Sequence, residues 1–109
     1  MVNVEINAGI CGFVTNAKVA SEDSQNVTFD VESQCEKIAM LGNNLSAKGP
    51  IDAYQEINPD GNSVLMGTVR ETLKGCCAGC AVPVGLFKAM QVAASIALPK
   101  DISIRINAE

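Results

Sequence analysis

Apolar and polar residues alternate with a period of two in four stretches of the chain, which is the pattern of strands that bury one face. These stretches are residues 2–8, 13–20, 27–32 and 102–107. Short turns at residues 9–12 and 21–25 separate the first three stretches, so an antiparallel meander is the expected arrangement.

Between the third and the last strand, the apolar residues take a helical spacing. Ser33 and Glu36 have the form of a capping box, which predicts a helix that begins with Ser33 as its N-cap and Cys35 in its first turn. A second helix is expected over residues 64–73. A third begins with Pro83 at its first position.

A short helix at residues 51–57 and a turn at residues 58–62 are expected between the first two main helices. The pattern predicts one α+β domain over residues 1–109, with the element order β-β-β-α-α-α-β. The expected architecture has two layers, a four-stranded and mostly antiparallel sheet with helices packed on one face. The last strand, residues 102–107, would then lie at an edge of the sheet, parallel to the first or the third strand.

Composition and charge narrow the classes of partner. The chain has 109 residues, 48% of them apolar, and a net charge of −4 with scattered basic residues, so nucleic acid is not an expected partner. The N-terminal residues do not resemble a signal peptide. The longest apolar-rich run, residues 89–98, is too short to span a membrane. A soluble, cytoplasmic protein is therefore expected.

Five cysteines and the absence of histidine define the candidate chemistry. In a reducing cytosol, such cysteines indicate free thiols, metal ligation or redox chemistry more than stable disulfides. Because no imidazole is present, histidine-based acid-base mechanisms are excluded, and any transition-metal site must use thiolates.

Cys77 and Cys80 have the C-x2-C spacing that lets two sulfur atoms bind one metal ion. The chain reverses direction at each turn of the predicted fold, and counting these reversals predicts that Cys11 and Cys35 lie at the same rim of the sheet as Cys77 and Cys80. These four cysteines form the predicted metal site, and Cys76 is a substitute for Cys77. Zinc is favoured over an iron-sulfur cluster as the cofactor, and no residue is assigned a catalytic role.

Two alternatives remain open at this stage. The first is a thiol-redox or sulfur-carrying protein that uses the Cys77 and Cys80 pair with Cys35. The second is a non-catalytic interaction domain in which the cysteines are buried as small apolar side chains. A protein partner or a homo-oligomer is expected, and the sequence does not identify which.

The order of four short motifs resembles a family of small proteins of unknown function from anaerobic bacteria and archaea. The motifs are Ile10-Cys11-Gly12-Phe13, Val31-Glu32-Ser33-Gln34-Cys35-Glu36, Cys80-Ala81-Val82-Pro83 and Ala97-Leu98-Pro99-Lys100-Asp101-Ile102. The resemblance covers nearly the whole chain and implies that histidine often replaces Cys77, as expected for a metal ligand. It departs at Ala81, where the family usually has proline, and it implies no activity.

Overall fold

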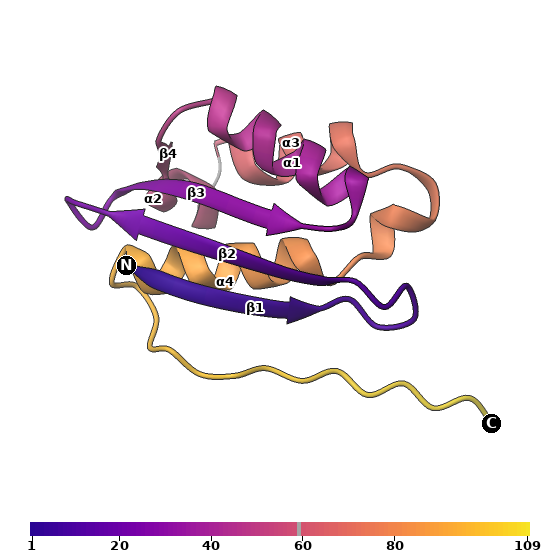
Figure 1. The fold of residues 1–109 in the computed structure, drawn as a ribbon. Helices are drawn as coiled ribbons and strands as arrows, with labels where there is room; N and C mark the ends of the chain where they lie inside the picture. Colours follow the sequence, from indigo (N-terminus) through magenta and orange to yellow (C-terminus); the bar gives the residue numbers. More distant parts are fainter. Residues whose placement is uncertain (59) are drawn as a thin grey trace.

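The computed structural model describes residues 1–58 and 60–109 as a sheet covered on one face by helices (Figure 1). The elements in chain order are β1 (Val2–Asn7), β2 (Val14–Ser21), β3 (Asn26–Ser33), α1 (Glu36–Ala47), β4 (Ile51–Asp52), α2 (Ala53–Ile57), α3 (Val64–Thr72), the 3-10 helix η1 (Gly75–Gly79) and α4 (Val82–Ala93).

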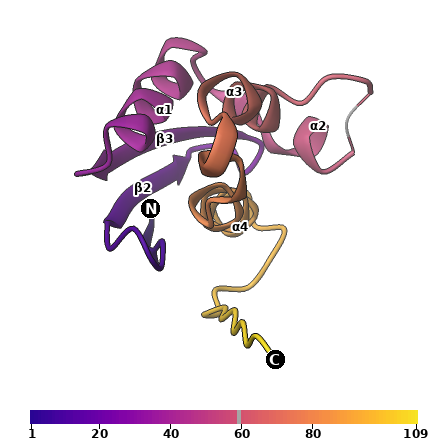
Figure 2. The same cartoon turned by 90° about the vertical axis from the view of Figure 1, so that its right-hand side faces the viewer.

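The sheet has the order β1-β2-β3-β4, and every neighbouring pair is antiparallel. Helix α4 packs on β1 and β2, α1 packs on β3, and all the helices lie on the same side of the sheet (Figure 2). The predicted α+β class, a four-stranded antiparallel sheet with helices on one face, is therefore confirmed.

The alternation of the strands explains the core. Inward-facing residues of the sheet meet the apolar stripes of the helices and exclude water from both. The buried apolar residues from the strands are Ile6, Ala17, Val19, Val27, Phe29 and Ile51, and the largest from the helices are Leu41, Leu45, Leu65, Leu86 and Met90.

Two glycines let helices lie close to the sheet. A Cβ atom added at Gly85 of α4 would meet the Ile6 side chain of β1 at 2.5 Å, and one at Gly42 of α1 would meet Val31 of β3 at 2.8 Å. Both distances are far below van der Waals contact, so these two positions set the separation between the layers.

One stretch, Gly75–Ala93, is apolar and long enough to cross a membrane by length and composition. In the structure it consists of two elements, η1 and α4, and α4 buries Val82, Leu86 and Met90 against the sheet. Helix α4 thus contributes one face to the hydrophobic core.

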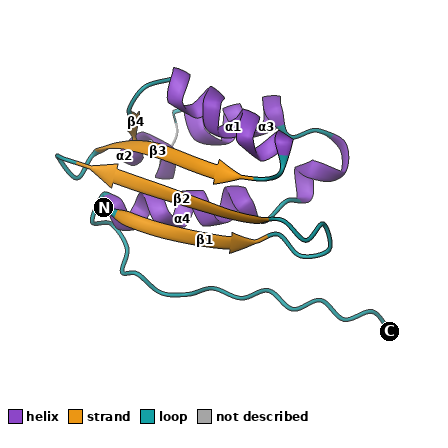
Figure 3. Cartoon of the chain, in the orientation of Figure 1, coloured by secondary structure: helices purple, strands orange, loops and turns teal. Residues whose placement is uncertain are grey.

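The fourth strand is not the predicted one. Residues 102–107 form no strand and extend from the fold as part of a C-terminal tail, residues 98–109, which Figure 3 draws as a loop. The sheet is completed instead by Ile51 and Asp52, which pair with Val27 and Asn26 of β3. A two-residue strand is too short to show a periodic pattern, so the sequence could not reveal it.

The capping box predicted at Ser33 is also wrong. Ser33 ends β3, where its hydroxyl accepts hydrogen bonds from Thr15 and from the Cys35 N–H. The N-cap of α1 is Cys35, which makes no side-chain cap. Because the Ser33 oxygen is already engaged within the sheet, it does not cap the helix.

A hydrogen-bonded turn joins β2 to β3. The Asp23 carboxylate accepts hydrogen bonds from the Asn26 side chain and from the N–H groups of Asn26 and Gln25. These donors, the Asn26 side chain first among them, hold the pKa of Asp23 well below its usual range.

A buried carboxylate connects α2 to α3. Glu56, which is 4% exposed, accepts hydrogen bonds from the Ser63 hydroxyl at 2.5 Å and from the N–H groups of Val64 and Leu65 at 2.9 and 2.8 Å. It thus satisfies the first N–H groups of α3. The turn predicted at residues 58–62 lies between these helices and includes Pro59, which is outside the described residues.

Candidate functional site: the thiols and the open face of the sheet

The three segments that carry the cysteines lie toward one end of the sheet. The β1–β2 turn holds Cys11, the β3–α1 junction holds Cys35, and η1 with its C-cap holds the rest. Figure 1 shows all three at the end toward which β1 and β3 run. Figure 2 faces that end and shows the β1–β2 turn at one side and the connection from α3 to α4 near the middle.

The five thiols have two kinds of environment. Cys11 and Cys76 are exposed, whereas Cys35, Cys77 and Cys80 are half-buried and pack against the hydrophobic core. The sulfur of Cys80 accepts a hydrogen bond from the N–H of Val82 at 3.4 Å, at the start of α4. All five are free thiols, so Cys77 and Cys80 are not joined by a disulfide.

The predicted metal-binding function is contradicted. Across residues 1–58 and 60–109, no group of three or more cysteine, aspartate or glutamate side chains lies close enough to hold a metal ion. Ligands of one zinc ion each lie about 2.3 Å from it, so cysteines that share only an end of the sheet are too dispersed. The thiol-redox alternative, which uses Cys77 and Cys80 as a pair, gains no support, because the structure leaves all five cysteines unpaired.

The two thiol environments predict an order of chemical reactivity. We expect N-ethylmaleimide to alkylate Cys11 and Cys76 before Cys35, Cys77 and Cys80, because packing against the core restricts access of the reagent. Mass spectrometry of peptides from protein alkylated for increasing times would give the order. Modification of Cys77 or Cys80 before both exposed thiols would contradict the half-buried packing of these two side chains.

The face of the sheet that no helix covers carries a regular arrangement of charges. The strand register places Asn16 of β2 between Glu5 of β1 and Glu32 of β3. In the next row, Lys18 lies between Asn3 and Asp30. Directly opposed residues on one face have Cβ atoms about 5 Å apart, so these two rows form one continuous polar surface.

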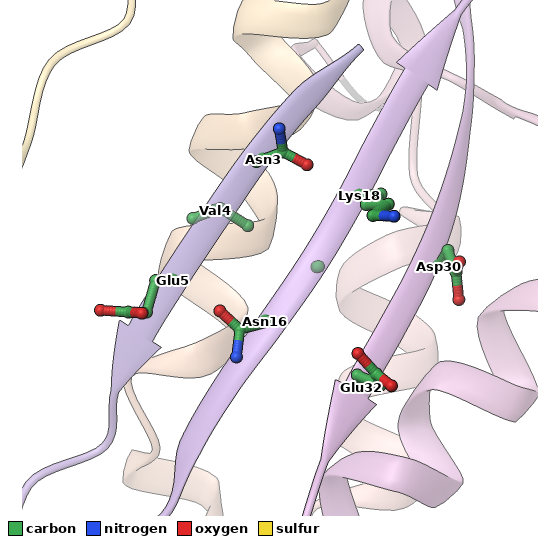
Figure 4. A pocket seen from close by; sticks show the side chains of 8 residues that line it. Asn3, Val4, Glu5, Asn16, Lys18, Asp30 and Glu32 are labelled. Carbon is green, nitrogen blue, oxygen red and sulfur yellow. The ribbon is translucent and has the colours of Figure 1, made fainter.

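This surface contains a hollow of about 570 Å³, open to solvent (Figure 4). We call it the acidic hollow, because its charged groups are three carboxylates and one ammonium. Its lining residues are Asn3, Val4, Glu5, Asn16, Ala17, Lys18, Asp30 and Glu32. The six polar residues among them are exposed, and they come from three neighbouring strands.

Comparison with known protein families shows which family the chain belongs to. Residues 2–106 match the family model described as "Family of unknown function (DUF6951)". The chain belongs to this family. No curated protein and no solved structure matches it. The family's description supports the predicted resemblance to proteins of unknown function, and the anaerobic origin that the resemblance implies stays a prediction.

The sequence reasoning missed the acidic hollow, although its signal was present. The polar positions of the alternating strands, Glu5, Lys18, Asp30 and Glu32 among them, indicate by themselves only which half of the pattern faces solvent. Their arrangement in rows depends on the pairing register, which the turn lengths alone do not fix.

Proposed function

We propose that this protein is a binding domain whose acidic hollow takes a basic segment of a partner protein. The observation that carries the proposal is the placement of Asp30 and Glu32 of β3 at one hollow in the sheet face that no helix covers. A lysine- or arginine-rich segment complements this charge, and the net charge of −4 favours its approach.

The sheet face suits an extended peptide. Successive side chains of such a peptide point to opposite sides, so basic residues at every second position would all point toward the sheet face that carries the three carboxylates and Lys18. Asn3 and Asn16 add amide donors and acceptors to the same surface. A cytoplasmic location, which the sequence predicts, suits a protein with five free cysteines.

Binding to a peptide of about ten alternating lysine and glycine residues tests this function. We expect the double variant Asp30→Asn, Glu32→Gln to raise the dissociation constant roughly 3- to 30-fold, because each exposed ion pair contributes about 0.3–1 kcal/mol. Binding should also weaken with added salt. Fluorescence anisotropy of the labelled peptide measures both effects.

The matched control is the double variant Glu22→Gln, Glu71→Gln, which makes the same change in net charge at exposed positions outside the hollow. It should bind the peptide nearly as well as the natural protein. Equal losses in the two double variants would mean that binding depends on net charge alone, and the proposal would fail.

A further inference from the structure

The C-terminal tail has the pattern of a strand but no partner within its own domain. Its isoleucines alternate with Ser103, Arg105 and Asn107, and Ile102, Ile104 and Ile106 are 53%, 66% and 88% exposed. In the described backbone, the last residue of the chain to join the fold by a backbone hydrogen bond is Ala97, whose N–H donates to the Gln91 carbonyl. The tail thus leaves three large apolar side chains in water.

Strand β1 offers a free edge that the tail could cover. It pairs with β2 on one side only, and its sequence from Val2 to Asn7 contains neither proline nor lysine, residues that often block edge pairing. Val2 and Val4, which face the helices, are only half-buried. The backbone N–H and C=O groups along the free side are therefore available to another strand.

The tail and β1 match when they are laid parallel with Ile104 beside Val4. Apolar residues then lie beside apolar residues over the helices, and polar residues extend the open face of the sheet. The resulting pairs are Ile102 with Val2, Ser103 with Asn3, Ile104 with Val4, Arg105 with Glu5, and Ile106 with Ile6.

The charges in this register are complementary. Arg105 is the one charged residue within the alternating part of the tail, and Glu5 is the one charged residue of β1. Figure 4 shows the Glu5 side chain turned toward the free side of β1. Opposite charges in neighbouring strands stabilise pairing, and a one-residue slip would instead place isoleucines on the polar face.

We propose that the tail of one copy pairs with β1 of a second copy, and that the second copy returns the same contact. Figures 1 and 2 both show the tail leaving its own domain without meeting its own β1. Pro99 lies in the connection, where its fixed φ favours an extended chain over a tight return. The reciprocal contact is a two-fold strand exchange between identical chains.

Charge reversal at the two paired positions tests the exchange. We expect the natural protein to be a dimer at about 100 µM by size-exclusion chromatography with light scattering. Glu5→Arg and Arg105→Glu each place like charges together, and each should raise the dimer dissociation constant roughly tenfold. Because both side chains are exposed, each variant should keep the circular dichroism of the folded protein.

Mixing the two variants decides between exchange and pairing within one chain. In a mixed dimer, both tails again meet a residue of opposite charge, so native mass spectrometry should show the heterodimer in excess over either homodimer. A monomeric natural protein, or a mixture in which heterodimers are not favoured, would overturn the proposal. The peptide-binding test changes Asp30 and Glu32 of β3, with Glu22 and Glu71 as its control, and leaves Glu5 and Arg105 unchanged. Its outcome is therefore independent of the strand exchange.

Discussion

Replacing Phe29 by alanine is expected to lower the free energy of unfolding by about 3–5 kcal/mol. Phe29 is 7% exposed, pairs across the sheet with Val19 of β2 and belongs to the hydrophobic core. Truncation removes the contacts of a whole aromatic ring and leaves a cavity that the packed helix α1 cannot fill. Urea unfolding followed by circular dichroism measures the loss.

Phe13→Ala is the matched control, since the same ring is removed at a position that is 37% exposed, just before β2. This variant should lose much less stability, within about 1 kcal/mol of the natural protein. A domain of this size is stable by roughly 5–15 kcal/mol, so the first variant should be unfolded by far less urea than the second. Similar losses in the two variants would contradict the packing described for β3.

Glu56→Ala is expected to cost about 2–3 kcal/mol, the second large effect. The substitution leaves two N–H groups of α3 without their acceptor and frees the Ser63 hydroxyl. The Leu65 N–H is buried, and a buried donor without a partner loses its hydration without compensation, which is why the cost exceeds that of an exposed hydrogen bond. Thermal and urea unfolding measure it.

Glu71→Ala is the matched control, because it removes the side chain of another glutamate from an exposed position of α3. Its effect should stay within about 0.5 kcal/mol. Ser63→Ala should fall between the two, at about 1 kcal/mol, since Ser63 also caps α3 by accepting a hydrogen bond from the Met66 N–H. A loss for Glu56→Ala no greater than that for Glu71→Ala would show that the buried carboxylate does not hold α3.

The class of the fold could be predicted because alternation and helical spacing report directly on which side chains are buried. Val19, Val27 and Phe29 face the core as their pattern requires. The fourth strand could not be predicted correctly, because the alternation of residues 102–107 indicates a strand only where a partner edge exists. The alternation of apolar and polar residues shows which face of a segment can be buried, but it does not show which strand the segment pairs with.

The candidate site was less predictable than the fold. Chain reversals indicate which end of the sheet a residue approaches, but neighbouring strands are about 4.8 Å apart, so one end spans far more than a metal coordination sphere. Cys11 in the β1–β2 turn and Cys80 before α4 reach the same end from different elements. Whether sulfur atoms converge depends on side-chain placement, which the order of elements leaves open.

The edge of the sheet opposite β1 is covered over only part of its length. Strand β4 has two residues, which pair with Asn26 and Val27 of β3, so residues 28–33 of β3 pair only with β2 among the described strands. Pairing of the tail with β1 would cover one edge only, and residues 28–33 would remain the edge at which a further strand could add.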